Sequence, residues 1–456
     1  MKASRAEISP EMQELSAWIA GAVKKPLPAQ IAERARIHLV DTFAAMISGS
    51  RLLPGRKAIA YVKARGGNPE DGVIGTRIVT SIPNAVLANA MLAHADETDD
   101  THPPSRTHPG SGVVPAALAI GERGRLTGKA VLRAIVLGYD VCARMLLAID
   151  EVHFRRTGHH PSAFGRVFGA AAAAGALLGL DARKARFLLS YASQQAAGLS
   201  TVYRDAEHIE KASLSGMPAH NGVAAALMVA EGFTGVDDVF SGERSFFYAF
   251  APEADRTQLT RGLGRDFEIL RCGLKRWPAG GPIQGPLHVL RDLMREHAFK
   301  AGDVKKLVAR MPEKDLHSVN DRDMPDICVQ HLLTVMLLDG TVTFKSAHDY
   351  ARMKNPKVLA LRRRVEAVGD AALNDALRRW RCVMEITLKD GRTLTHQTMA
   401  AKGTSENPLT REEEEEKALD LIAPVLGRHR AQTLVTELWK FDRIEDVRSL
   451  RKLGRV

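Results

Sequence analysis

The sequence is short of cysteine, and its hydrophobic residues never form a run long enough to cross a bilayer. Four cysteines are scattered over 456 residues without a CxxC spacing, which argues against a zinc ribbon, a redox motif or a disulfide framework and favours a reducing compartment. The longest apolar run covers 14 residues, 167–180, and indicates a buried helix. The first residues include Glu7, Glu11 and Glu14 and lack an apolar core, so we expect no signal peptide and a cytoplasmic protein without membrane contact.

Several catalytic and binding motifs are also missing. The segment 124–129 (GRLTGK) has one residue too few for a Walker A loop, and Ala130 stands where that loop needs Ser or Thr. No GxSxG or HExxH motif occurs. Aromatic residues make up only 5% and no basic helix is interleaved with them, so we expect no nucleic-acid partner. The net charge of +11 is compatible with small acidic substrates.

Helical periodicity dominates the first half of the chain. Apolar residues recur at four-residue steps from Ile31 to Ile47, which predicts an amphipathic helix. Many of the other apolar segments are rich in Ala and Gly, whose small side chains allow helix axes to approach closely, and this indicates a compact bundle. These further helices are predicted over residues 84–94, 128–147, 167–178, 182–197 and 217–231.

The pattern changes near residue 270. Residues 304–311 have the composition of a strand. Residues 380–388 alternate, then a Lys-Asp-Gly-Arg turn leads to a second extended segment at 393–398, which predicts a β-hairpin. Helices are predicted around these strands at residues 326–338, 356–365, 410–426 and 431–438.

We therefore predict a mainly α fold in which a large all-helical domain carries an inserted α+β lid domain. The helical domain is expected to comprise residues 1–271 plus 403–456, and the lid domain residues 272–402.

One loop concentrates chemically active side chains. Residues 94–110 read HADETDDTHPPSRTHPG and follow the end of a predicted helix. One interpretation is a solvated acidic loop whose aspartates cap the next helix. Another is that its carboxylates orient histidines for proton transfer. A divalent metal site is the third, although the spacing matches no strong template.

Three other groups accompany this loop. His160 precedes Pro161 at an expected helix start, where the helix would aim the imidazole and favour an anion. Lys211 lies shortly before Gly216 and the helix predicted after it. Lys275 falls at the boundary between the two predicted domains, where ligand sites are common. Taken alone, each lysine is more typical of a surface residue than of a site.

Seven segments, in the same order along the chain, together resemble blocks of the MmgE/PrpD family. They are residues 35–50, 92–122, 134–145, 159–181, 193–199, 215–235 and 337–340. The resemblance implies a two-domain subunit, helical domain plus lid, with the site between the two. It also implies a homodimer that works without metal or organic cofactor.

The same resemblance assigns roles to individual residues. It places catalytic positions on Asp100, Thr101, His108, His160 and, where some members carry a tyrosine, His331. It places substrate-binding positions on Glu97, Lys211 and Lys275. The sequence departs from the family pattern at Glu97, where Asp is usual, in one extra residue between Thr101 and His108, and in the segment KRWPAGGPIQ, which lacks the histidine usual after Lys275.

These residues suit chemistry beside a carboxylate. Proton loss from the neighbouring carbon builds negative charge, which Lys211 and Lys275, with Arg276 nearby, would stabilise. Histidines, with an ordinary pKa near roughly 6.5, can act as bases at neutral pH. We expect one of His108 and His160 to be the base and the other, or His331, to be the acid.

We therefore expect a metal-independent lyase that dehydrates or decarboxylates a small di- or tricarboxylate, most simply a carbon–oxygen lyase similar to 2-methylcitrate dehydratase. Asp100 and Thr101 would orient its histidines. Two alternatives stay open: an epimerase or isomerase that uses the same proton abstraction on a dicarboxylate, and a non-catalytic carboxylate-binding protein.

Overall fold

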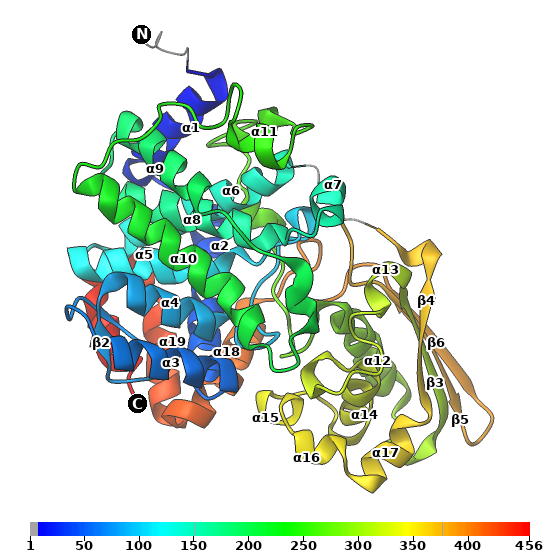
Figure 1. Cartoon of the computed structure of the whole chain (residues 1–456). Helices are drawn as coiled ribbons and strands as arrows, with labels where there is room; N and C mark the ends of the chain where they lie inside the picture. Colours follow the sequence, from blue (N-terminus) through cyan, green and yellow to red (C-terminus); the bar gives the residue numbers. More distant parts are fainter. Residues whose placement is uncertain (1–7, 150, 376) are drawn as a thin grey trace. The chain divides into compact units, whose positions relative to one another are not determined.

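Figure 1 shows the computed structural model of the chain, which describes residues 8–149, 151–375 and 377–456. Glu7, which contributed to the expectation about a signal peptide, lies outside these residues. The chain forms two compact units. The first, which we call the helical unit, comprises Met1–Ala95, Asp99–Cys272 and Leu421–Val456, and the second, the mixed unit, comprises Asp96–Thr98 and Gly273–Asp420.

The borders between these compact units fall after Cys272 and before Leu421, which lies within helix α18 (Arg411–Leu426). The division into a helical domain and a lid domain at residues 272 and 403 stays a prediction. Three residues of the acidic loop, 96–98, also belong to the mixed unit. Helices account for 60% of the structure and strands for 9%, so the prediction of a mainly α fold is confirmed.

Small residues allow the inner helices of the helical unit to pack closely. Helix α6 (Gly128–Ala148) and helix α8 (Pro161–Leu177) pack against each other. A Cβ at Gly138 of α6 would lie 2.4 Å from Val113, and one at Gly169 of α8 would lie 2.7 Å from the Cβ of Cys142. Larger residues would therefore force the helices apart.

The predicted helices of this unit are present. They correspond to α2 (Ala29–Gly49), α4 (Ile82–Ala93), α6, α8, α9 (Ala182–Gln194), α10 (Ile209–Ala230) and α19 (Arg428–Trp439). Its other regular elements are α1 (Pro10–Gly21), α3 (Leu53–Arg65), α5 (Pro109–Gly124), α7 (Glu151–Arg156), α11 (Phe246–Phe250), α20 (Leu450–Leu453) and the short strands β1 (Asp71–Gly72) and β2 (Val79–Thr80).

A four-stranded sheet in the order β4-β3-β5-β6 forms the centre of the mixed unit. The predicted strand is β3 (Val304–Pro312), and the predicted hairpin is the antiparallel pair β5 (Cys382–Leu388) and β6 (Thr393–Thr398). Strand β4 (Val365–Asp370), which pairs in parallel with β3, was not predicted. The helix expected over 356–365 ends at Arg362, before this strand.

Helices α12 (Gln284–His297) and α14 (Val329–Asp339) pack on this sheet (Figure 1). Alternate residues of β5, from Cys382 to Leu388, are buried in the shared core, as the period of two in a strand requires. The remaining helices of the mixed unit are short: α13 (Glu313–Leu316), α15 (Phe344–Ala347), α16 (Tyr350–Met353) and α17 (Pro356–Arg362).

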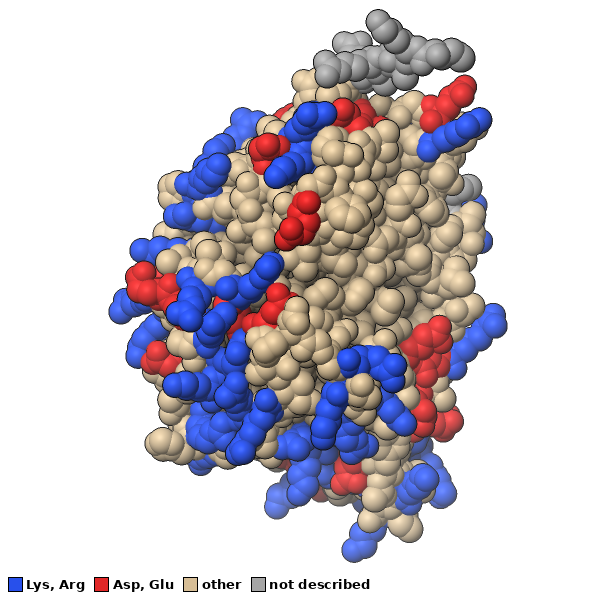
Figure 2. Space-filling view, turned by 60° about the vertical axis from the view of Figure 1, so that its left-hand side comes forward, with Lys and Arg blue, Asp and Glu red and all other residues tan. Residues whose placement is uncertain are grey.

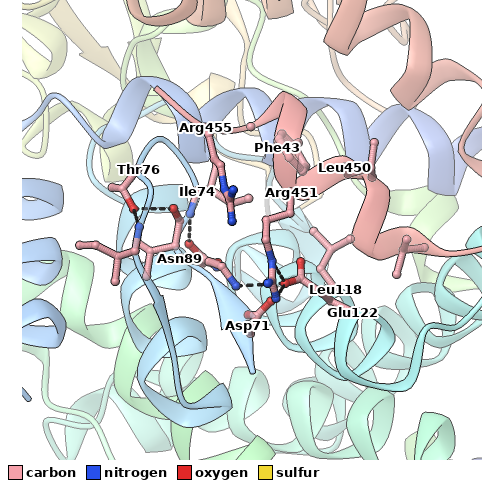
Figure 3. A pocket seen from close by; sticks show the side chains of 15 residues that line it. Phe43, Asp71, Ile74, Thr76, Asn89, Leu118, Glu122, Leu450, Arg451 and Arg455 are labelled. Carbon is pink, nitrogen blue, oxygen red and sulfur yellow. Dashed lines mark hydrogen bonds and ion pairs between the residues drawn. The ribbon is translucent and has the colours of Figure 1, made fainter. Parts of the chain in front are cut away.

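Residues that line a small pocket of the helical unit connect the C-terminal helix α20 to the rest of this unit (Figure 3). Arg451 of α20 forms an ion pair with Glu122 at the end of α5 and donates a hydrogen bond of 2.8 Å to the carbonyl of Glu70. Burial, and then the neighbouring Glu122, raise the pKa of Asp71 well above its usual value. Asp71 can therefore keep its proton and hydrogen bond to Glu122 without adding a second buried negative charge.

Lysine and arginine side chains are prominent on the face drawn in Figure 2, in keeping with the net charge of +11. Among the helices in the described part of the chain, none is both long and apolar enough to cross a membrane.

Candidate functional site

The acidic loop places two histidines at helix ends on either side of one buried carboxylate. His94 ends helix α4 as its C-cap residue, and His108 precedes helix α5 as its N-cap residue. The Nδ1 of His94 lies 2.7 Å from Oδ2 of Asp99, and the Nδ1 of His108 lies 3.6 Å from Oδ1 of the same carboxylate. The two rings are 5.2 Å apart between centroids. Asp99 is fully buried, whereas 26% of the His108 side chain is exposed.

The hydrogen bonds of His94 fix its protonation. The guanidinium NH2 of Arg166 lies 3.3 Å from Nε2 of His94. Because a guanidinium can only donate, Nε2 accepts, and Nδ1 carries the proton that is donated to Asp99. Burial, together with the charges of Lys211 and Arg166, lowers the pKa of His94 well below its usual value, although Asp99 opposes the shift. His94 is therefore neutral.

His108 has its tautomer set by a backbone carbonyl. Its Nδ1 lies 2.5 Å from the carbonyl oxygen of Asp100. Because a carbonyl oxygen only accepts, Nδ1 must carry the proton, and the neutral ring then has its lone pair on Nε2. Arg166 donates to the carbonyl of His108 over 3.1 Å, which ties the same guanidinium to both histidines. This arrangement suits a general base that acts through Nε2.

The carboxylate of Asp100 points away from His108. It accepts hydrogen bonds from Nδ1 of His38 at 3.0 Å, from the hydroxyl of Tyr139 at 2.7 Å and from the backbone N–H of Gly110 at 3.1 Å. A Cβ at Gly110 would lie 2.5 Å from the Tyr139 hydroxyl, so this close approach requires glycine. Asp100 therefore anchors the loop to the helical core, and it orients His108 through its backbone carbonyl.

His38, Asp100 and Cys272 each offer one ligand atom, and these atoms lie within 4.8 Å of one another. Two observations argue for a hydrogen-bonded core cluster instead of a metal centre. The Asp100 carboxylate already accepts three hydrogen bonds. Burial raises the pKa of the Cys272 thiol well above its usual value, whereas metal binding needs a thiolate.

His160 and Lys211 belong to the same side-chain cluster of the helical unit. His160 precedes α8 as its N-cap residue, and its backbone N–H donates to the carbonyl of Gly198 over 2.9 Å. Burial, then the charges of Arg166, Arg155 and His108, lower the pKa of His160 to about 3, so its ring is neutral. Lys211 acts on the pKa of His94.

The expected helix start after Gly216 is wrong, because α10 begins at Ile209 and carries Lys211 in its first turn. The structure thus brings His108 and His160 near Arg166, and Lys211 near His94.

Within the mixed unit, residues 96–98 are held by basic side chains. The ammonium group of Lys275 lies 3.0 Å from Oε2 of Glu97, and the Lys275 side chain is only 1% exposed. Lys417 of α18 donates to the carbonyl of Thr98 over 3.0 Å. Nε2 of His348 lies 3.3 Å from Oδ2 of Asp96. Burial alone would lower the pKa of His348, yet its hydrogen bond and ion pair with Asp96 raise it to about 9, so His348 is an imidazolium.

Arg276 is paired inside the mixed unit. Its guanidinium forms a hydrogen-bonded ion pair with Glu413, which also lies 2.9 Å from the ammonium of Lys402. Burial opposes ionisation of Glu413, but hydrogen bonds from Thr410, Lys402 and Arg276 lower its pKa to about 2. The positive charge of Arg276 is therefore already balanced by a neighbouring carboxylate.

Gln284 supports the backbone that follows Lys275. Its Oε1 accepts from the N–H groups of Arg276 and Trp277 at 3.0 and 3.2 Å, and its Nε2 donates to the carbonyls of Trp277 and Ala279 at 3.0 and 2.9 Å. Gln284 is fully buried. Its amide therefore satisfies four backbone groups of one loop.

His331 and Thr101 are both buried. His331 lies on α14, and neither of its ring nitrogens has a hydrogen-bond partner among the residues that the structure describes. Burial, then Arg362 and Arg352, lower the pKa of His331 to about 4, so its ring is neutral at neutral pH. Its assignment as an acid stays a prediction, as does the assignment of Thr101.

Sequence reasoning did not find His38, Tyr139 and Arg166, which complete the site in the helical unit. All three are polar residues on helices that bury many apolar side chains (α2, α6 and α8), and all three are fully buried. That combination was the available signal, because a buried polar side chain on an apolar helix face needs a partner. It would have marked the residues without showing which partner each one has.

Two models of one protein family together match most of the chain. The model of the MmgE/PrpD N-terminal domain matches residues 13–258, and that of the MmgE/PrpD C-terminal domain matches residues 277–441. The chain belongs to the MmgE/PrpD family, as the resemblance of its sequence blocks predicted.

Several curated relatives are named as decarboxylases. The chain is 27% identical over 443 residues to cis-aconitate decarboxylase of Homo sapiens, covering 93% of this chain and 90% of the relative. It is 26% identical over 448 residues to the Mus musculus protein of the same name, covering 93% and 89%. It is 24% identical over 481 residues to cis-aconitate decarboxylase of Aspergillus terreus, covering 96% and 95%.

Proposed function

We propose that this protein is a lyase that acts on a small di- or tricarboxylate, by proton transfer at a carbon beside a carboxylate. The names of its relatives favour decarboxylation over the dehydration that a 2-methylcitrate dehydratase-like enzyme would carry out. The observation that carries the proposal is the fixed tautomer of His108, whose Nδ1–H is held by the Asp100 carbonyl.

In the proposed reaction, His108 exchanges a proton with the substrate through Nε2. Asp99, 3.6 Å from Nδ1, would stabilise the imidazolium that forms when the ring takes up a proton. The cations Lys211 and Arg166 act on the neighbouring imidazoles, and Lys211 would also offset charge on a substrate carboxylate. His160, a neutral imidazole in the same cluster, would be the second proton-transfer group.

On the mixed unit we propose Lys275 and Glu97 as substrate contacts. The ammonium of Lys275, which pairs with Glu97 at 3.0 Å, would pair with a carboxylate of the bound substrate. We assign Arg276 a supporting role, because its charge is already matched by Glu413. All the groups invoked are side chains of the protein, so the proposed chemistry is metal-independent.

The test is proton NMR of the purified protein in D₂O with a panel of di- and tricarboxylates. We expect loss of a carboxylate with deuterium at the product carbon. Formation of an alkene by loss of water would show a dehydratase, and deuterium uptake into unchanged substrate would show an epimerase. Binding without turnover of any member would overturn the lyase proposal.

A matched pair of variants tests the residue assignment. His108→Gln removes the proposed base, and turnover should fall roughly 10²–10⁴-fold, the usual contribution of one acid–base group. His429→Gln alters an exposed histidine on α19 and should leave turnover unchanged. Equal turnover in the two variants would remove His108 from the mechanism.

A further inference from the structure

His348 is a histidine of the mixed unit whose two ring nitrogens both face acceptors. It is the C-cap residue of the short helix α15. Its Nδ1 lies 2.7 Å from the backbone carbonyl oxygen of Phe344, and its Nε2 lies 3.3 Å from Oδ2 of Asp96. Because a carbonyl oxygen and a carboxylate oxygen only accept, a ring that satisfies both contacts carries a proton on each nitrogen. His348 therefore faces Asp96 as a cation.

Carboxyl groups from three segments of the mixed unit interact with this ring. Besides Asp96, the charge of Asp326 acts on His348, and the charge of His348 acts in turn on Asp420. Asp420 also accepts a hydrogen bond of 2.7 Å from the backbone N–H of Phe344, which fixes the start of the helix that carries His348. Only 17% of the His348 side chain is exposed. The negative charges of Asp96 and Asp326 offset the cost of burying the imidazolium.

The contact with Asp96 connects His348 to the turn that carries Glu97. Oδ1 of Asp96 accepts from the backbone N–H of Thr98 over 3.1 Å, and Oδ2 accepts from the Thr98 hydroxyl over 2.7 Å. A side chain of aspartate that binds the backbone two residues later forms a local turn around the residue between them. Asp96 and Thr98 are buried, whereas 15% of the Glu97 side chain is exposed. The orientation of Asp96 thus decides where Glu97 lies.

Two lysines contact the same turn from other elements. The ammonium of Lys275 lies 3.0 Å from Oε2 of Glu97, and Lys417 of α18 donates to the carbonyl of Thr98 over 3.0 Å. His348, Lys275 and Lys417 therefore each contact a different residue of the turn. Among these three cations, Lys275 is the one that we propose as a substrate contact. Its ammonium is oriented by Glu97, so its position depends on the turn.

We infer that His348 is a positioning residue: its imidazolium orients Asp96, and Asp96 fixes the turn that holds Glu97 and the Lys275 ammonium in place for a carboxylate of the substrate. The inference rests on the proposed function of Lys275. His348 acts through Asp96 and Glu97 and does not itself contact the substrate. Its loss should weaken substrate binding and leave the proton-transfer step unchanged, because Lys275 binds a carboxylate and His108 moves the proton.

The first test is steady-state kinetics of His348→Gln with the carboxylate that the wild type converts in the NMR experiment. The KM should rise about tenfold, as expected for one weakened charge-assisted contact, and kcat should stay within about twofold of the wild type. His317→Gln alters an exposed histidine of the same unit and is the matched control, with both constants unchanged. An unchanged KM in His348→Gln, or a fall in kcat alone, would overturn the inference.

Two further measurements do not depend on turnover. The nitrogen-15 shifts of the His348 ring in the wild type at pH 7 should show both nitrogens protonated, and one unprotonated nitrogen would overturn the inference even if no variant folds. Hydrogen exchange of the Thr98 amide, which donates to Asp96, should be at least about tenfold faster in His348→Gln than in the wild type and in His317→Gln. Exchange at the wild-type rate in His348→Gln would equally overturn it.

A double-variant cycle tests whether His348 acts through Asp96. Asp96→Asn keeps an acceptor for the Thr98 N–H but loses the charge that faces His348. The Thr98 amide of the double variant should exchange about as fast as in either single variant, because both remove the same contact. Additive effects would mean that His348 acts by another route, and would overturn the inference. Absence of any turnover in the wild type would remove the proposed function, while the ring nitrogens and the Thr98 amide would still decide whether His348 holds the turn.

Discussion

Replacing Asp140 by asparagine should change how the stability of the protein depends on pH. Burial raises the pKa of Asp140 from 3.8 to about 7, against the opposing effects of Arg144, the Glu268 N–H and Arg271, and with a smaller contribution from the charge of Glu268. Below about pH 4 the folded and unfolded chains both hold this proton. Between pH 4 and 7 the unfolded chain releases it while the folded chain keeps it, so the folded state loses stability as the pH rises.

The size of the effect follows from the shift. One pKa unit corresponds to 1.36 kcal/mol, so the two units between pH 5 and pH 7 correspond to about 3 kcal/mol. Unfolding entropy of about 2.1 cal/mol/K per residue gives about 1 kcal/mol/K for 456 residues. The melting temperature of Asp140→Asn, relative to the wild type, should therefore increase by about 3 °C when the pH is raised from 5 to 8.

Differential scanning fluorimetry over this pH range measures the difference directly. Using the difference between variant and wild type removes the contributions of the other titrating groups. Asp390→Asn is the control, because the backbone and side chain of Arg392 lower the pKa of that exposed carboxyl, and no increase toward pH 8 is expected. A difference for Asp140→Asn that stays constant with pH, or decreases, would refute the assignment of a raised pKa to this buried carboxyl.

Two further predictions concern the mixed unit. Glu97→Gln removes the carboxylate 3.0 Å from the buried Lys275 ammonium and should destabilise the protein by about 3 kcal/mol, measured by urea unfolding. Glu97→Asp keeps a carboxylate and should destabilise it less. Equal stability of the wild type and both variants would contradict the buried ion pair. Gln284→Ala removes four hydrogen bonds to one loop. At about 1 kcal/mol for each bond, the free energy of unfolding should fall by about 4 kcal/mol. Hydrogen exchange at residues 276–279 that matches the wild type would show that the amide does not hold the loop.

The elements that the sequence predicted well are those whose pattern is local. Helix α2 follows from apolar residues at four-residue steps, and the β5–β6 hairpin from an alternating segment, a Lys-Asp-Gly-Arg turn and the extended segment after it. Strand β4 has no such pattern, because only Val365 of its six residues is buried. Its place is set by parallel pairing with β3, whose residues lie nearly 60 positions earlier in the chain. Pairing over that separation leaves no local signal.

The same distinction applies to the site. The loop, its histidines and the lysines could be located from residue types and family resemblance. Their partners could not, because Arg166 reaches His94 across 72 positions and Tyr139 reaches Asp100 across 39. The border between the compact units at Leu421 also leaves no mark in the local sequence pattern. The helical pattern of α18 is continuous, although its first part belongs to the mixed unit.

The adjacent aspartates of the acidic loop have different roles because their side chains point in different directions. Asp99 and Asp100 are both fully buried, yet their carboxylates face different surroundings. Asp99 faces the imidazoles of His94 and His108, whereas Asp100 faces His38 and Tyr139 in the core. Two like charges next to each other in sequence can both stay buried because each has its own donors. The loop thereby joins the fold and the proposed chemistry: the side chain of Asp100 fixes its backbone, and that backbone carbonyl fixes the proton on His108.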